Sequence, residues 1–398
     1  MADPSASPSR HRGRGRRTHG VLYVLVACAL AVALVVGLSS IWFYRHLGDN
    51  LTSYDPEGQL HDRPDVIAPG DPINILVMGS DTREGEQTVE EMLDGGARSD
   101  TTILLHLSSD RKHAYGVSIP RDTIVDRPEC TLPNGDTVPA ENDVMFNTAF
   151  YYGGPACTQQ TVESITNVRI QHSVVVNFAG FKDMVDAIGG VEVCIPHAID
   201  DDEYNMHLDA GTQVIKGNEA LMYVRVRHGF GNGSDIGRMK RQQAFIASMA
   251  AKVVSAGTLT RIDRLVKFLN AATKSLALDE GLADILKLAK LGNQFRQIGL
   301  DGIQFLTVPW EAYEPDPNRI QLMEPEADRL WRKIRNDKPL SPRLADDAIS
   351  AADPGTPTTG PSGSPSGSPS GSPSHNPSSS ASADAEAAAE AEANGLCS

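Results

Sequence analysis

The sequence predicts an α/β fold, with a mixed, largely antiparallel central sheet that helices flank on both faces, behind one N-terminal transmembrane helix. Short runs of β-branched and aliphatic residues alternate through the middle of the chain with segments of helical apolar spacing. Strands and helices interleaved in this way form a sheet covered on both sides. A long uncharged apolar run lies near the N-terminus, and a low-complexity tail ends the chain.

The N-terminal segment predicts a membrane anchor. Residues 1–20 contain five arginines, whereas residues 21–44 contain no charged group. A helix over 21–44 would reach about 36 Å, enough to cross a hydrocarbon core of roughly 30 Å. A cleaved signal peptide is the alternative, but its apolar part usually spans only about 7–15 residues and ends in small residues. This run ends in three aromatic residues, as a membrane-interface belt does.

Charge predicts both orientation and partners. Basic residues that precede a membrane span stay inside, so we expect residues 1–20 to be a cytoplasmic tail and residues 45–398 to be extracellular, in a single-pass cell-membrane protein. The arginines then serve as a topology signal. The whole chain carries 36 basic and 51 acidic residues, a net charge of −15. We therefore expect no nucleic-acid partner, because binding to phosphate backbones requires a basic surface.

The region 71–340 contains the predicted elements of the folded domain. Apolar and β-branched runs predict strands at 73–78, 102–107, 114–119, 173–177, 191–195, 220–226 and 303–308. Helical apolar spacing predicts helices at 181–188, 245–253, 262–276 and 282–291.

The segments on either side are more polar. We expect a stalk at 45–70 and a disordered tail at 341–398, because the Ser/Gly/Pro-rich and Ala/Glu-rich stretches there bury too little apolar surface to offset chain entropy.

A first group of charged residues falls at one edge of the predicted sheet. If the first three strands form a meander, the end of the first, the start of the second and the end of the third lie together. Two carboxylates from separate segments suit a hard cation such as Mg²⁺, and arginines among them suit bidentate contacts with phosphate oxygens. The residues at this edge are Asp81, Arg83, Arg98, Asp100, Arg121 and Asp122.

A second group follows in the segment RVRHGFGNGSDIGRMKRQQ, residues 225–243. Arg225 and Arg227 are two apart on a predicted strand and would share a face. Arg238 and Gln242 are four apart at the start of a predicted helix, with Arg241 beside them, and a helix N-terminus itself favours anions. The alternative is a solvated charged face with Asp235 as an ion-pair partner. The two groups together favour phosphate or pyrophosphate recognition.

Six sequence blocks resemble the LytR-CpsA-Psr family over about residues 72–250. The resemblance implies a membrane-anchored extracytoplasmic phosphotransferase of Gram-positive bacteria. Such enzymes move a glycopolymer, for example teichoic acid, from a polyprenyl-pyrophosphate carrier to the C6 hydroxyl of N-acetylmuramic acid in peptidoglycan, leaving a phosphodiester. A pyrophosphatase side activity is compatible with this chemistry. The blocks are NILVMGSDTR (74–83), RSDTTILLHL (98–107), VSIPRD (117–122), FNTAFYYGGP (146–155), VVVNFAGFKDMVDAIGGVEVCIP (174–196) and VRVRHGFGNGSDIGRMKRQQ (224–243).

The resemblance also implies roles for individual residues. Asp81 and Asp100 match the carboxylates that hold Mg²⁺, with Mn²⁺ as an alternative metal. The residues expected to contact pyrophosphate are Arg83, Arg98, Arg121, Arg225, Arg227, Arg238, Arg241 and Gln242. Catalysis is expected from Arg98, Arg121, Asp122 and Asp235, with Asp122 and Asp235 as equal candidates for the general base.

One departure from the family keeps an alternative open. The family usually reads Lys-Ile-Asn where this chain has Met145, Phe146 and Asn147. The missing basic residue favours a non-catalytic scaffold that binds polyprenyl-pyrophosphate or wall polymer. A membrane-bound regulator is a further alternative, but the expected cytoplasmic part of about 20 residues argues against it.

The five cysteines show no spacing typical of a zinc site. Outside the membrane disulfides are allowed, and we expect Cys130 to pair with Cys157. We expect Cys194 to be buried after its strand and Cys397 to lie in the tail.

Overall fold

The computed structural model describes residues 17–66, 70–81, 98–201, 206–227, 231, 233–254, 261–354 and 388–397. The chain divides into two units, Met1–Asp49 and Asn50–Ser398. The first contains the helix α1 (Arg17–Asp49), in which the 30 residues Gly20–Asp49 are long and apolar enough to cross a membrane. Its length and composition agree with the span expected at 21–44.

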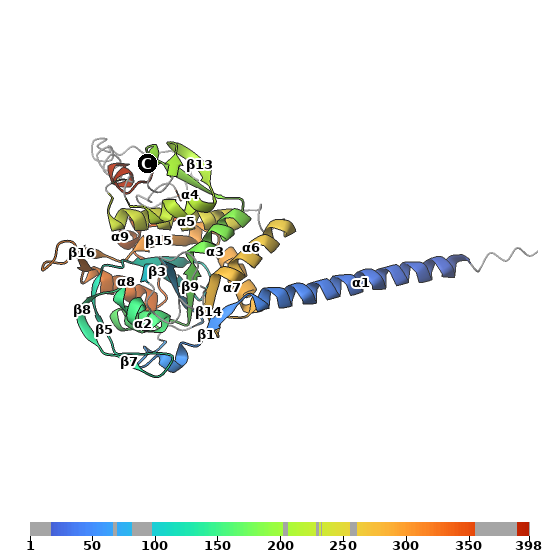
Figure 1. Ribbon diagram of the computed structural model, residues 1–398, viewed down its shortest axis with the longest axis horizontal. Coiled ribbons are helices and arrows are strands. Elements are labelled where there is room, and N and C mark those ends of the chain that lie inside the picture. The colour runs from blue at the N-terminus through green and yellow to red at the C-terminus, as the bar shows by residue number, and fades with distance from the viewer. Residues whose placement is uncertain are drawn as a thin grey trace, which may run out of the picture. The chain divides into compact units, whose positions relative to one another are not determined.

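The second unit is built on an eight-stranded mixed sheet with the order β1-β14-β9-β2-β3-β4-β15-β18 (Figure 1). The strands β2, β3 and β4 form the antiparallel meander expected from the sequence, whereas β9 joins β2 and β15 joins β4 in parallel. The bounds are β1 (Thr52–Tyr54), β2 (Ile73–Asp81), β3 (Arg98–Leu107), β4 (Ala114–Ile119), β9 (His172–Asn177), β14 (Leu276–Asp279), β15 (Ile303–Thr307) and β18 (Ile349–Ser350).

Helices cover both faces of this sheet, and short two-stranded ribbons form separate small sheets around it. The helices are α2 (Thr148–Thr166), α3 (Phe178–Ala187), α4 (Gly217–Arg225), α5 (Asp235–Val254), α6 (Ile262–Ser275), α7 (Ile285–Ile298), α8 (Glu326–Arg335) and α9 (Pro342–Ala345). The ribbon strands are β5 (Ile124–Arg127), β6 (Cys130–Thr131), β7 (Thr137–Val138), β8 (Glu141–Met145), β10 (Val191–Ile195), β11 (Ile199–Asp201), β12 (Met206–Leu208), β13 (Gly211–Ile215), β16 (Trp310–Ala312) and β17 (Ile320–Leu322). Two 3-10 turns lie at Glu57–Gln59 and Leu300–Gly302.

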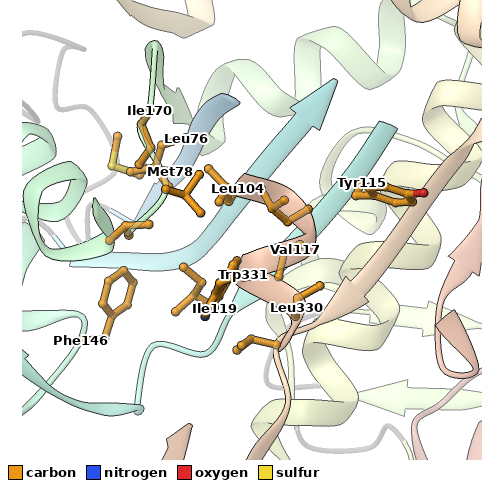
Figure 2. Close-up of a cluster of buried hydrophobic side chains, with 14 of the residues drawn as sticks. Leu76, Met78, Leu104, Tyr115, Val117, Ile119, Phe146, Ile170, Leu330 and Trp331 are labelled. Atoms are coloured by element: carbon orange, nitrogen blue, oxygen red, sulfur yellow. The ribbon is translucent and has the colours of Figure 1, made fainter. Parts of the chain in front are cut away.

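Side chains along the central strands point alternately to the two faces of the sheet, and each face has its own hydrophobic core. Leu76 and Met78 of β2 point to the face that α2 and α8 cover, where Trp331 of α8 is buried among them (Figure 2). Ile75, the neighbour of Leu76, belongs to the core on the opposite face, under α5. The period of two along a strand therefore fixes which side chains meet which helix.

One predicted strand is wrong. The run 220–226 forms the end of helix α4 rather than a strand. Its valines suggested a strand, but Ala220, Leu221 and Val224 lie on one helical face and are buried against α3 and α5. Tertiary packing of that face outweighs the strand preference of the valines. Arg225 and Arg227 therefore do not share a strand face.

The expected stalk at 45–70 also differs from the structure. Residues Thr52–Tyr54 form strand β1, which pairs in parallel with β14 at the edge of the main sheet. The side chain of Arg63 is only 7% exposed and makes a two-pronged ion pair with Glu163 of α2, at 2.8 and 2.9 Å. Burial lowers the pKa of Arg63, but Glu163 and Glu57 raise it further, so the net shift is upward. This segment is thus part of the folded unit.

The tail differs from the prediction as well, in its described residues. Strand β18 adds to the main sheet after residue 340, and residues 388–393 form a short helix. Cys397 pairs with Cys194 of β10, so Cys194 is not simply a buried thiol. The composition of the tail did not predict this order, because a disulfide can hold a segment that has little apolar surface of its own. The expected pair Cys130–Cys157 is confirmed.

These disulfides predict a defined thiol count. Blocking the unfolded, unreduced chain with a thiol reagent should label one cysteine, Cys28, which is the free cysteine of the described residues. Reduction beforehand should label five. Peptide mapping should recover Cys130 with Cys157 and Cys194 with Cys397. Three or more labelled cysteines without reduction would contradict the pairing.

The buried ion pair predicts an asymmetric loss of stability. Arg63→Ala should lower the free energy of unfolding by about 3–5 kcal/mol, because it leaves the Glu163 carboxylate buried and unpaired. Glu57→Ala removes the exposed partner of the same arginine, and should cost no more than about 1 kcal/mol. Urea unfolding of both variants measures the difference. Equal losses would contradict a structural role for the buried pair.

Candidate functional site

The site begins at an irregularity in β3. Gly79 and Ser80 are adjacent on β2, yet they oppose Thr101 and Ser99 of β3. Asp100, between these two residues of β3, therefore has no opposing residue on β2. Asp100 is therefore the extra residue of a β-bulge, a feature that redirects a side chain and often lies beside active sites. Its carboxylate is 17% exposed and accepts a hydrogen bond from Arg121 Nη1.

Arg121 follows the end of β4 and lies among three carboxylates. Beyond its bond to Asp100, its Nε lies 3.5 Å from Asp235 Oδ1 and 3.7 Å from Asp122 Oδ2. Burial lowers the pKa of Arg121, but Asp100, Asp235 and Asp122 together raise it above its usual value. Its buried Nε makes no hydrogen bond to a described group and lies between the carboxylates of Asp235 and Asp122.

Asp235 is the first residue of α5, and it gathers arginines around one oxygen. The helix starts here because the Ser234 hydroxyl accepts a hydrogen bond from the Gly237 N–H at 3.0 Å, as an N-cap does. Asp235 Oδ1 accepts from Arg238 Nη2 at 2.6 Å and lies 3.8 Å from Arg227 Nη1. The other oxygen, Oδ2, is buried and has no hydrogen-bond donor among the described residues.

Arg238 supports the cluster from the interior. Only 3% of its side chain is exposed, and its Nη2 also lies 3.5 Å from the backbone oxygen of Asp100. Burial lowers the pKa of Arg238 more than Asp235 raises it. An arginine still remains protonated at neutral pH, because its ordinary value is so high. Arg238 thus connects the start of α5 to the bulge in β3.

Asp122 has a partner that the sequence did not reveal. Arg319, just before β17, places Nη1 3.2 Å from Asp122 Oδ1. The β16–β17 ribbon docks at this edge through a bridge between Thr123 and Ile320. Almost 200 residues separate the two members of this ion pair, and no local motif marks Arg319. Only the docking of the ribbon brings them together.

Arg241 and Gln242 differ from the expectation that both would contact pyrophosphate. Arg241 is almost fully buried, its guanidinium donates to the backbone oxygen of Val226, and burial lowers its pKa to about 10. Gln242 donates to the backbone oxygen of Val224 at 2.9 Å and accepts from Thr101 at 3.1 Å. Gln242 thus holds the last turn of α4 and Arg241 the residue after it against α5, so both support Arg227 rather than project into the cluster.

The remaining predicted residues fall in different places. Arg225 ends α4 with its guanidinium 5.3 Å from the centre of the Phe178 ring. Asp81 and Arg98 are paired across the ends of β2 and β3, but their side chains lie outside the described part of the structure, as does the whole of Arg83. Within the described residues, no group of three or more His, Cys, Asp or Glu side chains is arranged to hold a metal.

The arrangement can bind an oxyanion. Arg121, Arg227, Arg238 and Arg319 converge on one end of the sheet from four different segments, and three aspartates balance them. Forked guanidinium groups recognise phosphate oxygens well. The carboxylates hold the arginines in place when no anion is bound, because an unpaired, partly buried charge is costly. Asp100 and Asp235 also offer the oxygen donors that a hard cation prefers.

Comparison with known proteins gives a consistent result. The sequence matches the LytR_cpsA_psr family model over residues 48–336. It is 32% identical to the cell wall biosynthesis protein LcpA of Corynebacterium glutamicum over 261 residues, which are 59% of this chain and 49% of that protein. The match therefore spans about half of that relative's length.

Two further comparisons cover more of the chain. The sequence is 29% identical to the polyisoprenyl-teichoic acid–peptidoglycan teichoic acid transferase TagV of Bacillus subtilis over 324 residues, 78% of this chain and 76% of that protein. The structure of the LytR-Csp2A-Psr enzyme from Actinomyces oris superimposes with a TM-score of 0.55 at 17% identity, over 74% of this chain and 97% of that one. At this identity the structural likeness concerns the fold alone.

The arginine cluster predicts specific binding of inorganic pyrophosphate. Arg121→Gln should weaken this binding at least about tenfold, because it removes a charge-assisted, forked donor from the centre of the cluster. Lys290→Gln, at an exposed position on α7, should leave it unchanged. Isothermal titration calorimetry on the full chain in detergent measures both. Equal weakening by the two substitutions would indicate a non-specific charge effect and contradict the site.

Proposed function

Because this chain belongs to the LytR-CpsA-Psr family, we propose that it transfers a glycopolymer from a polyprenyl-pyrophosphate carrier to peptidoglycan, leaving a phosphodiester on the C6 hydroxyl of N-acetylmuramic acid. The observation that carries the proposal is the convergence of Arg121, Arg227 and Arg238 on Asp235 beside the bulged Asp100. The similarity to TagV, named as a polyisoprenyl-teichoic acid–peptidoglycan teichoic acid transferase, supports the substrate class.

In this proposal the protein positions the groups and neutralises charge. The acceptor hydroxyl oxygen forms a bond to the phosphorus that carries the glycopolymer. The bond from that phosphorus to the bridging oxygen breaks, and polyprenyl phosphate leaves with the electron pair. The arginines bind the pyrophosphate oxygens and stabilise the charge that develops on the leaving phosphate.

The acceptor hydroxyl must also lose its proton. Asp235 is the better of the two candidate bases, because its Oδ2 has no hydrogen bond to a described group. Asp122 is more fully engaged, with Oδ1 on Arg319 and Oδ2 close to Arg121. A general base needs a free oxygen within reach of the hydroxyl. We therefore assign the proton transfer to Asp235, whose Oδ2 is buried in this structure, so the side chains around it must move for the acceptor hydroxyl to reach it.

Mg²⁺ fits this site by the chemistry of its donors. It would be held by Asp100 and Asp81, since Mg²⁺ is usually bound by one or two carboxylates with waters and phosphate oxygens completing the shell. When bound, it would neutralise charge on the pyrophosphate. The bulge supports this role by turning Asp100 toward the arginine cluster. Mn²⁺ offers the same oxygen preference.

The N-terminal helix supplies the location. We propose that α1 crosses the cell membrane once, with the basic residues before it in the cytoplasm and the unit from Asn50 outside. The two disulfides support an oxidising compartment for that unit. A carrier lipid that stays in the same membrane can then present its pyrophosphate to the site.

A scaffold that binds the carrier without turnover is the second candidate. One observation favours it: Met145, the last residue of β8, stands where the family usually has a basic residue. In that case the arginine cluster would hold pyrophosphate and release it unchanged.

A transfer assay separates the two candidates. The full chain in detergent is incubated with a short polyprenyl-pyrophosphate glycan, soluble uncrosslinked peptidoglycan strands and Mg²⁺, and mass spectrometry detects phosphodiester product and polyprenyl phosphate. We expect product from the wild type that chelator, Asp100→Ala and Arg121→Ala abolish. Asp235→Asn should lower the rate by roughly 10²–10⁴-fold, as loss of a general base does.

Lys290→Gln is the matched control and should transfer normally, since α7 contributes nothing to the arginine cluster. If the wild type binds the carrier but yields neither product nor released phosphate, the scaffold replaces the transferase. If Asp122→Asn reduces the rate and Asp235→Asn does not, the proton transfer belongs to Asp122.

A further inference from the structure

We infer that a basic pocket beside the arginine cluster binds the peptidoglycan acceptor through carboxylates of its stem peptides; this rests on the proposed function. The pocket lies between the start of α5, the end of β15, and helices α8 and α9, and has a volume of about 1170 Å³. Its basic lining residues are Lys240, Arg329, Arg332, Lys333, Lys338 and Arg343.

Charge sets this pocket apart from the rest of the molecule. Six basic side chains line it against three acidic ones, in a chain whose net charge is −15. Arg329 is paired with Glu326 of its own helix. Lys333, Lys338 and Arg343, in contrast, form no ion pair with any residue that the structure describes. These three cations can therefore engage a ligand without first breaking a bond within the protein.

The pocket borders the site. Ser234 and Ile236 line it, and they flank Asp235, the residue assigned to take the acceptor's proton. The β16–β17 ribbon makes a second connection, because Trp310 at its start lines the pocket and Arg319 near its other strand contacts Asp122. A chain lying in the pocket can thus present a hydroxyl group to Asp235.

The residues that line the pocket favour the peptidoglycan acceptor over the polyprenyl chain and the pyrophosphate of the donor. A polyprenyl chain could pack on apolar lining residues such as Leu306, Val308 and Met323, but it offers no partner to the cations of the lining. A pyrophosphate concentrates its charge on one group, and the arginine cluster already provides for it. The cations of the pocket are instead spread along α8, α9 and their connection, as separate carboxylates on successive stem peptides would require. Trp310 is 36% exposed and offers a flat apolar surface to a sugar ring.

The C-terminal segment forms one wall of this pocket. Ala393 and Asn394 line it, and the Cys194–Cys397 disulfide ties their segment to β10. Leu396 is buried beside the bond. Gly231 packs so closely on this segment that a Cβ there would lie 2.2 Å from the backbone oxygen of Ala393. The disulfide therefore adds a covalent link to a wall that also packs on the core through Ala391 and Leu396.

The test uses charge reversal at two exposed positions. The double variant Lys338→Glu/Arg343→Glu should bind a soluble, uncrosslinked tetrasaccharide with peptide stems at least about tenfold more weakly than the wild type. The matched control is Lys290→Glu/Arg296→Glu, two exposed positions on α7, and should change the affinity less than about twofold. Calorimetry on the full chain in detergent measures binding. Cys397→Ser should weaken it in the same direction, and amidating the probe's carboxylates should remove the effect of the double variant.

The outcomes are distinct. Equal weakening in the pocket variant and the control, or no weakening in either, would overturn the inference. So would a pocket variant that loses affinity for the polyprenyl-pyrophosphate glycan and keeps it for the peptidoglycan probe, because the pocket would then hold the donor. Failure of the proposed function gives a different result. The wild type would then transfer no glycopolymer, but it would still bind the peptidoglycan probe more tightly than the pocket variant does.

Discussion

The structure at the functional end of the sheet depends on one constraint, the need to pair charges that are partly withdrawn from water. Arg238 is 3% exposed, and Asp100, Arg121 and Asp235 are each 15–17% exposed. An unpaired charge at that depth would cost several kcal/mol. Arg238 is therefore paired with Asp235 of its own helix, and Arg121 pairs with Asp100 and Asp235 across segments. These contacts fix the ends of β3 and β4 and the start of α5 relative to one another.

That constraint also shapes what the site can do. A cluster whose arginines are positioned in advance by carboxylates needs little rearrangement when an anion arrives. Asp235 balances three arginines through Oδ1 and leaves Oδ2 without a described donor. One residue thus organises the binding groups, and in the proposed function it also takes the acceptor's proton. Because it begins α5, it also stands at the boundary between the arginine cluster and the basic pocket.

The periphery shows a different source of order. The segment before β2 and the C-terminal residues 388–397 have few apolar residues, yet both are fixed to the folded unit. A buried ion pair from Arg63 to Glu163 holds the first, and the Cys194–Cys397 disulfide holds the second. Neither the ion pair nor the disulfide can be predicted from a local sequence pattern, because each joins residues far apart in the chain. Composition alone therefore misrepresented both segments as a stalk and a disordered tail.

The sequence by itself determined the apolar N-terminal helix, the β2–β3–β4 meander and the gathering of Asp100 and Arg121, because periodicity and strand ends are local properties. It also predicted the Cys130–Cys157 pair. Tertiary structure decided the rest. Packing made residues Gly217–Arg225 a helix rather than a strand, turned Arg241 into the interior, and brought Arg319 to Asp122. These outcomes depend on the burial and pairing of groups distant in sequence, which local preference does not encode.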